Sequence, residues 1–84
     1  MTYEIKWKPQ ALSFLQRLPR DIALRIHNRI GKLRNNPFHF LEHYEGESTV
    51  HKLRIGDYRA LITVDLRQRI VVIEVLDKRS RIYK

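Results

Sequence analysis

The chain of 84 residues contains no cysteine, and its 17 lysines and arginines outnumber its 9 acidic residues, which gives a formal net charge of +8. The length suits one small domain, residues 1–84. The lack of cysteine excludes disulfides, thiolate metal sites and thiol nucleophiles, and no apolar run is long enough to span a bilayer. We therefore expect a cytoplasmic protein without a signal peptide or membrane contact, whose positive charge favours a nucleic acid as partner.

The first part of the chain predicts a strand followed by two helices. Residues 3–7 alternate apolar and charged side chains, the period-two pattern of a half-buried strand. Pro9 suits the first turn of a helix whose apolar positions recur every three or four residues up to about Leu18. After Pro19, a second helix is predicted up to residues 35–37. Its apolar stripe consists of Ile22, Ile26, Ile30 and Leu33.

The solvent side of this second helix is basic. Arg25, Arg29 and Lys32 recur at positions i, i+4 and i+7, so they share one face of the helix. Such a run is often only a solvated surface. Alternatively, it contacts the phosphates of a nucleic acid or an acidic protein. We retain these three residues as candidate phosphate-binding residues.

Residues 38–48 lose all periodicity and combine aromatic with acidic side chains, so we predict a loop there without assigning it a role. His39, His43 and His51 invite comparison with a metal site. Without a definite helix and a carboxylate partner, their spacing is weak evidence for one. We interpret these histidines as residues at the edge of the core and expect no metal and no other cofactor.

A β-hairpin centred on Gly56-Asp57 is the most informative stretch of the sequence. A two-residue turn that begins with glycine matches the twist of the flanking strands. It pairs Ile55 with Tyr58, Arg54 with Arg59, Leu53 with Ala60 and Lys52 with Leu61. Alternation then places Tyr58 on the core face and collects Lys52, Arg54 and Arg59 on the other, open face of the sheet. Opposed arginines are unfavourable unless an anion lies between them, which predicts a phosphate-binding site.

Residues 70–76 form a nearly continuous apolar run that predicts the best-buried strand. The basic tail that follows contains Arg79, Arg81 and Tyr83. The element order β-α-α-β-β-β predicts an α+β fold in which two N-terminal helices pack on one face of a mostly antiparallel four-stranded sheet. The cations of the hairpin and of the tail would then meet on the other face.

Cleavage of RNA through its 2′-hydroxyl needs a base, a group that stabilises negative charge on the phosphate, and an acid. Arginine binds phosphate oxygens bidentately but keeps its proton. We expect the neighbouring arginines to lower the pKa of Lys52, which makes Lys52 a candidate general base. Tyr83 is suited to stacking on a nucleobase. These residues alone predict phosphate binding, and they do not separate a nuclease from a nucleic-acid-binding module.

The whole chain resembles the RelE/ParE toxin superfamily, and the RelE branch in particular. The resemblance rests on helices split at Leu18-Pro19, on Lys52-Leu53-Arg54, on the turn Gly56-Asp57-Tyr58-Arg59 and on the closing Lys78-Arg79-Ser80-Arg81-Ile82-Tyr83. It implies the toxin of a toxin–antitoxin pair, a metal-independent endoribonuclease that enters the A site of the 30S ribosomal subunit, cleaves the mRNA there and inhibits translation. It also implies a cognate RelB-like antitoxin as partner.

The resemblance further implies roles for single residues. Lys52 matches a candidate base, Arg59 the arginine after the turn tyrosine, Arg79 the arginine that stabilises phosphate, and Tyr83 the tyrosine that orders or stacks on the RNA. Arg54 and Arg81 match further basic positions.

Two departures from the RelE pattern make a weaker nuclease an alternative. Val50 stands where RelE enzymes with the fullest site have a second lysine, and the segment from Arg79 to Tyr83 is shorter by about a residue or two. A ParE-like toxin that inhibits DNA gyrase without cutting nucleic acid shares the fold and is a further alternative.

Overall fold

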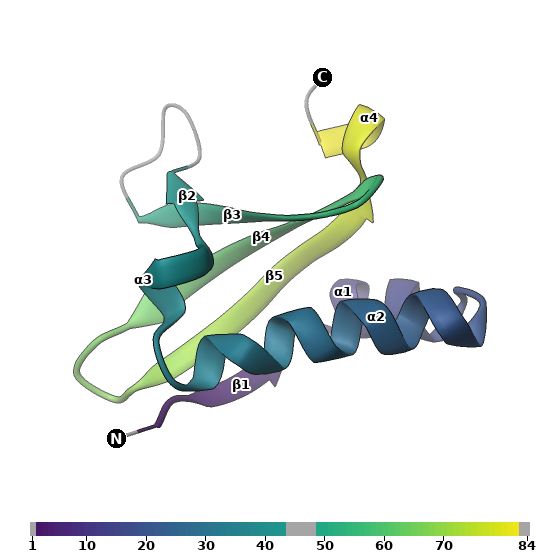
Figure 1. The fold of residues 1–84 in the computed structure, drawn as a ribbon. Helices are drawn as coiled ribbons and strands as arrows, with labels where there is room; N and C mark the ends of the chain where they lie inside the picture. Colours follow the sequence, from purple (N-terminus) through teal and green to yellow (C-terminus); the bar gives the residue numbers. More distant parts are fainter. Residues whose placement is uncertain (1, 44–48, 83–84) are drawn as a thin grey trace.

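The structure, a computed structural model, describes residues 2–43 and 49–82, the last two of them by their backbone alone. A mixed sheet with the strand order β1-β5-β4-β3-β2 forms its centre (Figure 1). Its strands are β1 (Glu4–Trp7), β2 (Glu42–His43), β3 (Val50–Ile55), β4 (Tyr58–Asp65) and β5 (Ile70–Lys78). The helices are α1 (Pro9–Gln16), α2 (Arg20–Gly31), the 3-10 turn η1 (Lys32–Arg34), α3 (Pro37–Phe40) and α4 (Arg79–Ile82).

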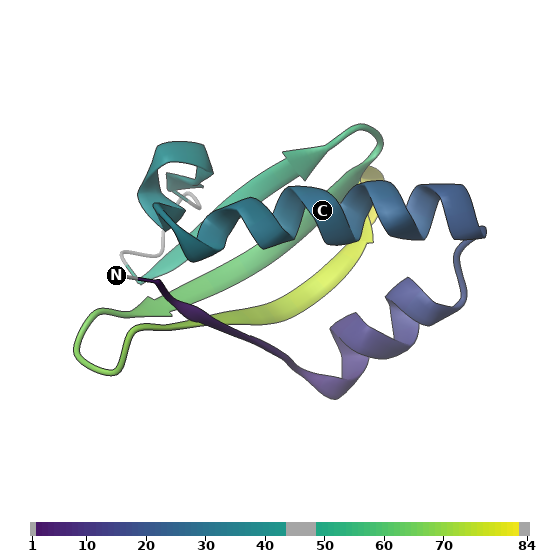
Figure 2. The ribbon, with the colours of Figure 1, turned by 60° about the horizontal axis from the view of Figure 1, so that its bottom comes forward.

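The α+β class and the two N-terminal helices on one face of the sheet are confirmed, and Figure 2 shows α1 and α2 lying across that face. Two expectations are wrong. The sheet has five described strands instead of four, and residues 38–48 are not wholly a loop, because α3 ends and β2 forms within them. The additional strand is only two residues long, and it pairs antiparallel with the start of β3. Pairs this short leave no periodic pattern in a sequence.

Helix α1 is anchored to the sheet by a polar contact as well as by its apolar side. Ala11, Phe14 and Leu15 are buried, as their spacing predicts. Strand β1 pairs parallel with β5 only as far as Ile73, so beyond that point β5 has a neighbouring strand on its β4 side alone. The side-chain amide of Gln10 fills this gap: it donates to the carbonyl of Leu76 at 3.1 Å and accepts from the Leu76 N–H at 3.1 Å. The N–H and the carbonyl of Leu76 thereby both have a hydrogen-bond partner on the side of β5 that β1 does not reach.

The hairpin between β3 and β4 has the predicted register, with all four expected pairs in place. Gly56 has a φ of 59°, the left-handed conformation that a Gly-first two-residue turn requires. Because the turn fixes the register, Leu53 and Ile55 face the core, and Lys52 and Arg54 face the opposite side.

A β-bulge distorts the pairing of β4 with β5 between Leu61 and Ile62. The ladder joins Leu61 to Val75 and Ile62 to Ile73, so Glu74 is the extra residue. An extra residue reverses the alternation of side chains, and this explains why Val71, Ile73 and Leu76 are all fully buried. Strand β5, which the sequence predicts to be the best-buried strand, therefore buries these three side chains in the core.

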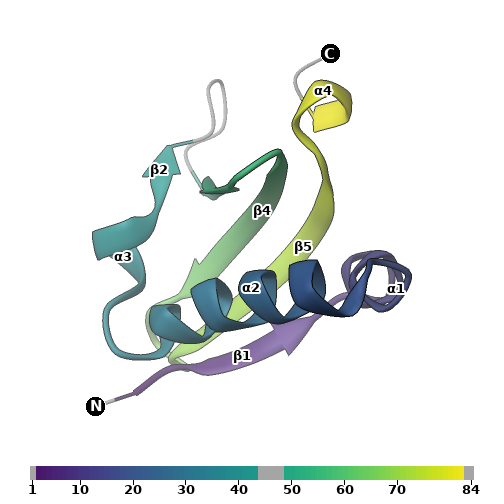
Figure 3. The same cartoon turned by 45° about the vertical axis from the view of Figure 1, so that its right-hand side comes forward.

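Helix α4 continues from β5 and lies on the other side of the sheet from α1 and α2 (Figures 1 and 3). It contacts both β4 and β5 at the end of the sheet where the β3–β4 turn lies. The sheet face opposite α1 and α2 is thus bounded at this end by α4. In the described part of the chain, no helix has the length and hydrophobicity that crossing a bilayer requires.

Candidate nucleic-acid interface

The candidate cations of the hairpin lie on the predicted face of the sheet, but they differ in their exposure. Arg54 and Arg59 are direct partners across β3 and β4, and Lys52 precedes Arg54 by two residues on the same face. Arg54 is exposed and Lys52 is half-buried. Arg54 therefore presents its guanidinium to solvent, where an anion can reach it.

Arg59 is much less exposed than its position on the open face of the sheet predicts. It was expected to be open to solvent, yet only 3% of its surface is exposed. Its Nη1 donates to the carbonyl of Tyr58 at 2.8 Å and to the carbonyl of Gly56 at 3.0 Å. The guanidinium thus folds back onto its own turn, and the ladder places Asp77 of β5 beside it on the other flank. Within the opposed pair, Arg59 thus directs its guanidinium to the turn carbonyls, whereas Arg54 is exposed.

Arg79 is tied to the hairpin through its backbone. Its N–H donates to the carbonyl of Asp57 at 2.8 Å, which fixes the start of α4 against the turn. Its side chain is exposed. Arg81 lies in α4, where only its backbone is described, and Tyr83 lies outside the described residues. The proposed reach of Tyr83 therefore stays a prediction.

Of the three candidate residues of this segment, Arg25 and Arg29 lie on α2 beside the hairpin, whereas Lys32 belongs to η1. Arg29 Nη2 donates to the carbonyl of Arg54 at 3.2 Å, and Arg25 Nη1 would lie 4.0 Å from a Cβ placed at Gly56. Lys32 lies apart from them and lines a separate hollow beside α3. Arg25 and Arg29 therefore lie next to the hairpin backbone, while the side chain of Arg54 faces the other side of the sheet; all three residues are exposed.

Two of the histidines form a cross-strand pair at the β2–β3 edge. His43 and His51 are ladder partners whose ring centroids lie 5.1 Å apart, and the Phe38 ring meets His51 edge-on at 5.5 Å. Burial, and then the neighbouring His43, lower the pKa of His51. His39 packs against Phe40 instead. Within residues 2–43 and 49–82, no group of three or more metal-ligating side chains occurs.

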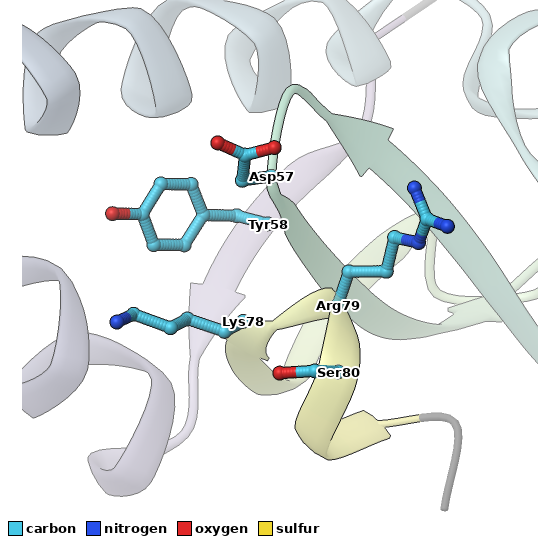
Figure 4. A pocket seen from close by; sticks show the side chains of 5 residues that line it. All are labelled: Asp57, Tyr58, Lys78, Arg79 and Ser80. Carbon is cyan, nitrogen blue, oxygen red and sulfur yellow. The ribbon is translucent and has the colours of Figure 1, made fainter.

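The sequence interpretation missed a hollow of about 700 Å³ beside the hairpin turn. It is lined by Asp57, Tyr58, Lys78, Arg79 and Ser80 (Figure 4). Tyr58 packs against the core, as predicted, with its ring meeting Phe14 edge-on at 6.1 Å, but it is only half-buried. No local sequence pattern indicates this hollow, because the pairing of Tyr58 with Lys78 across β4 and β5 depends on the bulge at Glu74 and cannot be read from alternation alone.

Comparisons with known proteins agree with this architecture. The model of the ParE toxin of type II toxin–antitoxin systems matches residues 5–83. Comparison with curated proteins by sequence gives no match.

Solved structures are similar over nearly the whole chain. The RelBE2 toxin–antitoxin complex from Mycobacterium tuberculosis contains a chain 25% identical, with a TM-score of 0.81, over 94% of this chain and 100% of that one. The archaeal RelE–RelB complex from Pyrococcus horikoshii gives 29% identity and a TM-score of 0.82 over 96% and 99% of the two chains.

A chain of the ParDE system from Pseudomonas aeruginosa is 16% identical with a TM-score of 0.69, covers 90% of this chain and 95% of its own length, and supports the fold alone. The family model carries the ParE description, and the structural neighbours are mostly RelE toxins. The chain belongs to the RelE/ParE toxin superfamily of type II toxin–antitoxin systems.

Proposed function

We propose that this toxin is a ribosome-dependent endoribonuclease that cleaves mRNA in the ribosomal A site. One observation carries the proposal: the hairpin register places Lys52 and Arg54 on one face, and the Arg79 N–H bond to Asp57 brings a further arginine to the same hairpin. The RelE chains from M. tuberculosis and P. horikoshii, at 25% and 29% identity, support a RelE-like activity over a purely protein-binding one.

The residues divide the chemistry between them. Lys52 is the candidate general base that takes the proton of the 2′-hydroxyl as its oxygen attacks the phosphorus. The bond from phosphorus to the 5′-oxygen breaks, and water protonates this leaving oxygen, so the products are a 2′,3′-cyclic phosphate and a 5′-hydroxyl. Arg54 and Arg79, both exposed, hold the phosphate oxygens and stabilise the charge that develops on them. Arg59, whose guanidinium is bound to the turn carbonyls, positions the hairpin. By resemblance, Tyr83 orders the RNA and Arg81 contacts its backbone. The shared helical face of Arg25, Arg29 and Lys32 supports further contacts with the RNA phosphates.

The cellular setting follows from the family. The similar chains from M. tuberculosis and P. horikoshii were solved in complexes with their antitoxins. We infer a RelB-like antitoxin as the partner of this toxin, together with the ribosome and mRNA, and a cytoplasmic location in which these meet.

A ParE-like activity is the second candidate, because the family model that matches residues 5–83 is that of ParE. The burial of Arg59 and the valine at position 50 also favour it, since both remove a cation from the open face. In that case the toxin would inhibit DNA gyrase and leave RNA intact.

Induced expression followed by primer-extension mapping of mRNA ends separates the two candidates. We expect new ends within codons for the wild type, and loss of these ends for Lys52→Ala and Arg79→Ala. Lys6→Ala removes an exposed cation from β1, at the opposite edge of the sheet, and should cleave like the wild type. Intact mRNA with loss of DNA supercoiling would select the ParE-like activity. Salt-sensitive binding of nucleic acid with neither effect would leave a binding module.

A further inference from the structure

The hollow beside the hairpin turn adjoins the proposed catalytic face, because Arg79 is also among its lining residues. The side chains of Tyr58, Lys78 and Ser80 project to the same side in Figure 4, with the carboxylate of Asp57 above the tyrosine ring. The side chain of Arg79 projects to the opposite side. With a volume of about 700 Å³, the hollow falls within the size range of small-ligand sites.

We propose that this hollow binds one nucleotide of single-stranded RNA and prefers guanine. The proposal deepens the proposed function, on which it rests for the choice of RNA as ligand. The lining supplies one group for each part of a nucleotide: an aromatic ring for the base, a carboxylate for the base edge, and an ammonium with a hydroxyl for the phosphate.

Tyr58 is suited to hold the base by stacking. Unpaired RNA bases stack on aromatic side chains, and this contact is tolerant of sequence. The edge contact with Phe14 and the packing of Tyr58 against the core fix the orientation of its ring before a ligand arrives. A ring that is already fixed loses little conformational entropy on binding.

Asp57 supplies the preference among bases. An ionised carboxylate accepts hydrogen bonds and donates none. The Watson–Crick edge of guanine presents two neighbouring donors, N1–H and N2–H₂, which a carboxylate can accept together. Adenine and cytosine each place an acceptor beside their amino group, and uracil flanks its single N–H with carbonyl oxygens, so each of them sets an acceptor against the carboxylate. The lining therefore matches guanine.

Lys78 and Arg79 connect the hollow to the catalytic face. They are consecutive residues at the junction of β5 and α4, and their side chains project to opposite sides of it (Figure 4). The bond from the Arg79 N–H to the Asp57 carbonyl holds this junction against the turn. An RNA strand that crosses the junction can thus place one phosphate near Arg79 and a neighbouring nucleotide in the hollow.

Titration of the isotope-labelled full chain with GMP, AMP, CMP and UMP, followed by amide NMR, tests this site without the ribosome. We expect shifts at residues 57–58 and 78–80 and affinity for GMP at least about fivefold above that for the other nucleotides. Asp57→Asn should abolish the preference for GMP and strengthen AMP binding, because the side-chain amide can donate to the acceptor that adenine presents beside its amino group. Lys78→Gln should weaken all four nucleotides alike, by about threefold to tenfold.

Two controls keep the test specific. Asp21→Asn makes the same change at an exposed carboxylate that lines the neighbouring groove, and Lys6→Gln removes an exposed cation on β1; both should bind like the wild type. Shifts confined to other residues, no preference for GMP, or a preference that survives Asp57→Asn would each overturn the proposal.

The two proposals fail separately. Nucleotide binding with the predicted preference but without mRNA cleavage would refute the proposed nuclease activity and support the proposed binding site. Cleavage of mRNA without the nucleotide preference would remove the site and retain the activity.

Discussion

The guanidinium of Arg59 supports the hairpin turn from inside. Replacing Arg59 by alanine leaves the carbonyls of Gly56 and Tyr58 without this donor at a buried position, so we expect the free energy of unfolding to fall by about 1–3 kcal/mol. Urea denaturation of Arg59→Ala measures it. Arg54→Ala, which removes the exposed partner across the ladder, should change stability by less than about 0.5 kcal/mol. Equal stability of both variants would contradict the assigned role of Arg59.

His51 makes the stability depend on pH in a defined direction. Burial and His43 lower the pKa of His51 in the folded protein below its ordinary value of 6.5, so the unfolded chain binds a proton first as pH falls. The stabilisation is complete above pH 6.5 and is lost as pH decreases through the folded-state pKa. Denaturation across this range should show a smaller loss for His51→Asn than for the wild type. The control variant His27→Asn changes an exposed histidine on α2, and its stability should depend on pH as that of the wild type does.

At the scale of elements, the β3–β4 hairpin depends on its glycine. Gly56 has a φ of 59°, a conformation that residues with a Cβ rarely adopt. There is nevertheless room for a Cβ, which would meet only Arg25 Nη1, at 4.0 Å. The cost of Gly56→Ala is therefore conformational, about 1–2 kcal/mol. Gly31, at the end of α2, provides the matched control, because a Cβ there meets nothing within 4 Å. Gly31→Ala should stabilise the protein by about 0.5–1 kcal/mol. Thermal unfolding that shifts both variants in the same direction would refute this account of the turn.

The elements also show how far the sequence could predict the structure. The hairpin register was predictable because a two-residue turn and alternating side chains are local signals. The pairing of β2 and the bulge at Glu74 were not predicted, because each depends on contacts between distant segments. The face of Arg59 was predicted, but its burial was not. The carbonyl acceptors are local to the turn, but their use by Arg59 requires a particular side-chain conformation.

The hollow beside Tyr58 also combines residues that local patterns predict with residues that they do not. Asp57 and Tyr58 belong to the turn that was predicted, whereas Lys78 and Ser80 come from the end of β5 and from α4. Only the sheet register brings Lys78 beside Tyr58. Local sequence patterns find a phosphate-binding hairpin, and three-dimensional pairing is needed to find its neighbouring hollow.

For the whole molecule, a net charge of +8 makes binding of RNA depend on salt. The affinity for a single-stranded oligonucleotide should fall linearly with salt on logarithmic axes, with a slope of about 0.7 per phosphate contact. Arg54→Ala and Arg79→Ala should each reduce that slope by about 0.7, the value for one lost phosphate contact. Fluorescence anisotropy over a salt series measures the slope. Lys6→Ala on β1 should leave it unchanged, and an equal reduction for all three variants would show that only total charge matters.

The most direct test of the proposed activity is cleavage of a defined mRNA programmed on purified ribosomes, with DNA supercoiling by gyrase measured in parallel. We predict new 5′ ends in the A-site codon only when ribosomes and toxin are both present, with cleavage slowed about a hundredfold or more in Arg79→Ala. Full-length mRNA in the presence of folded toxin and ribosomes, together with loss of gyrase supercoiling, would contradict the account.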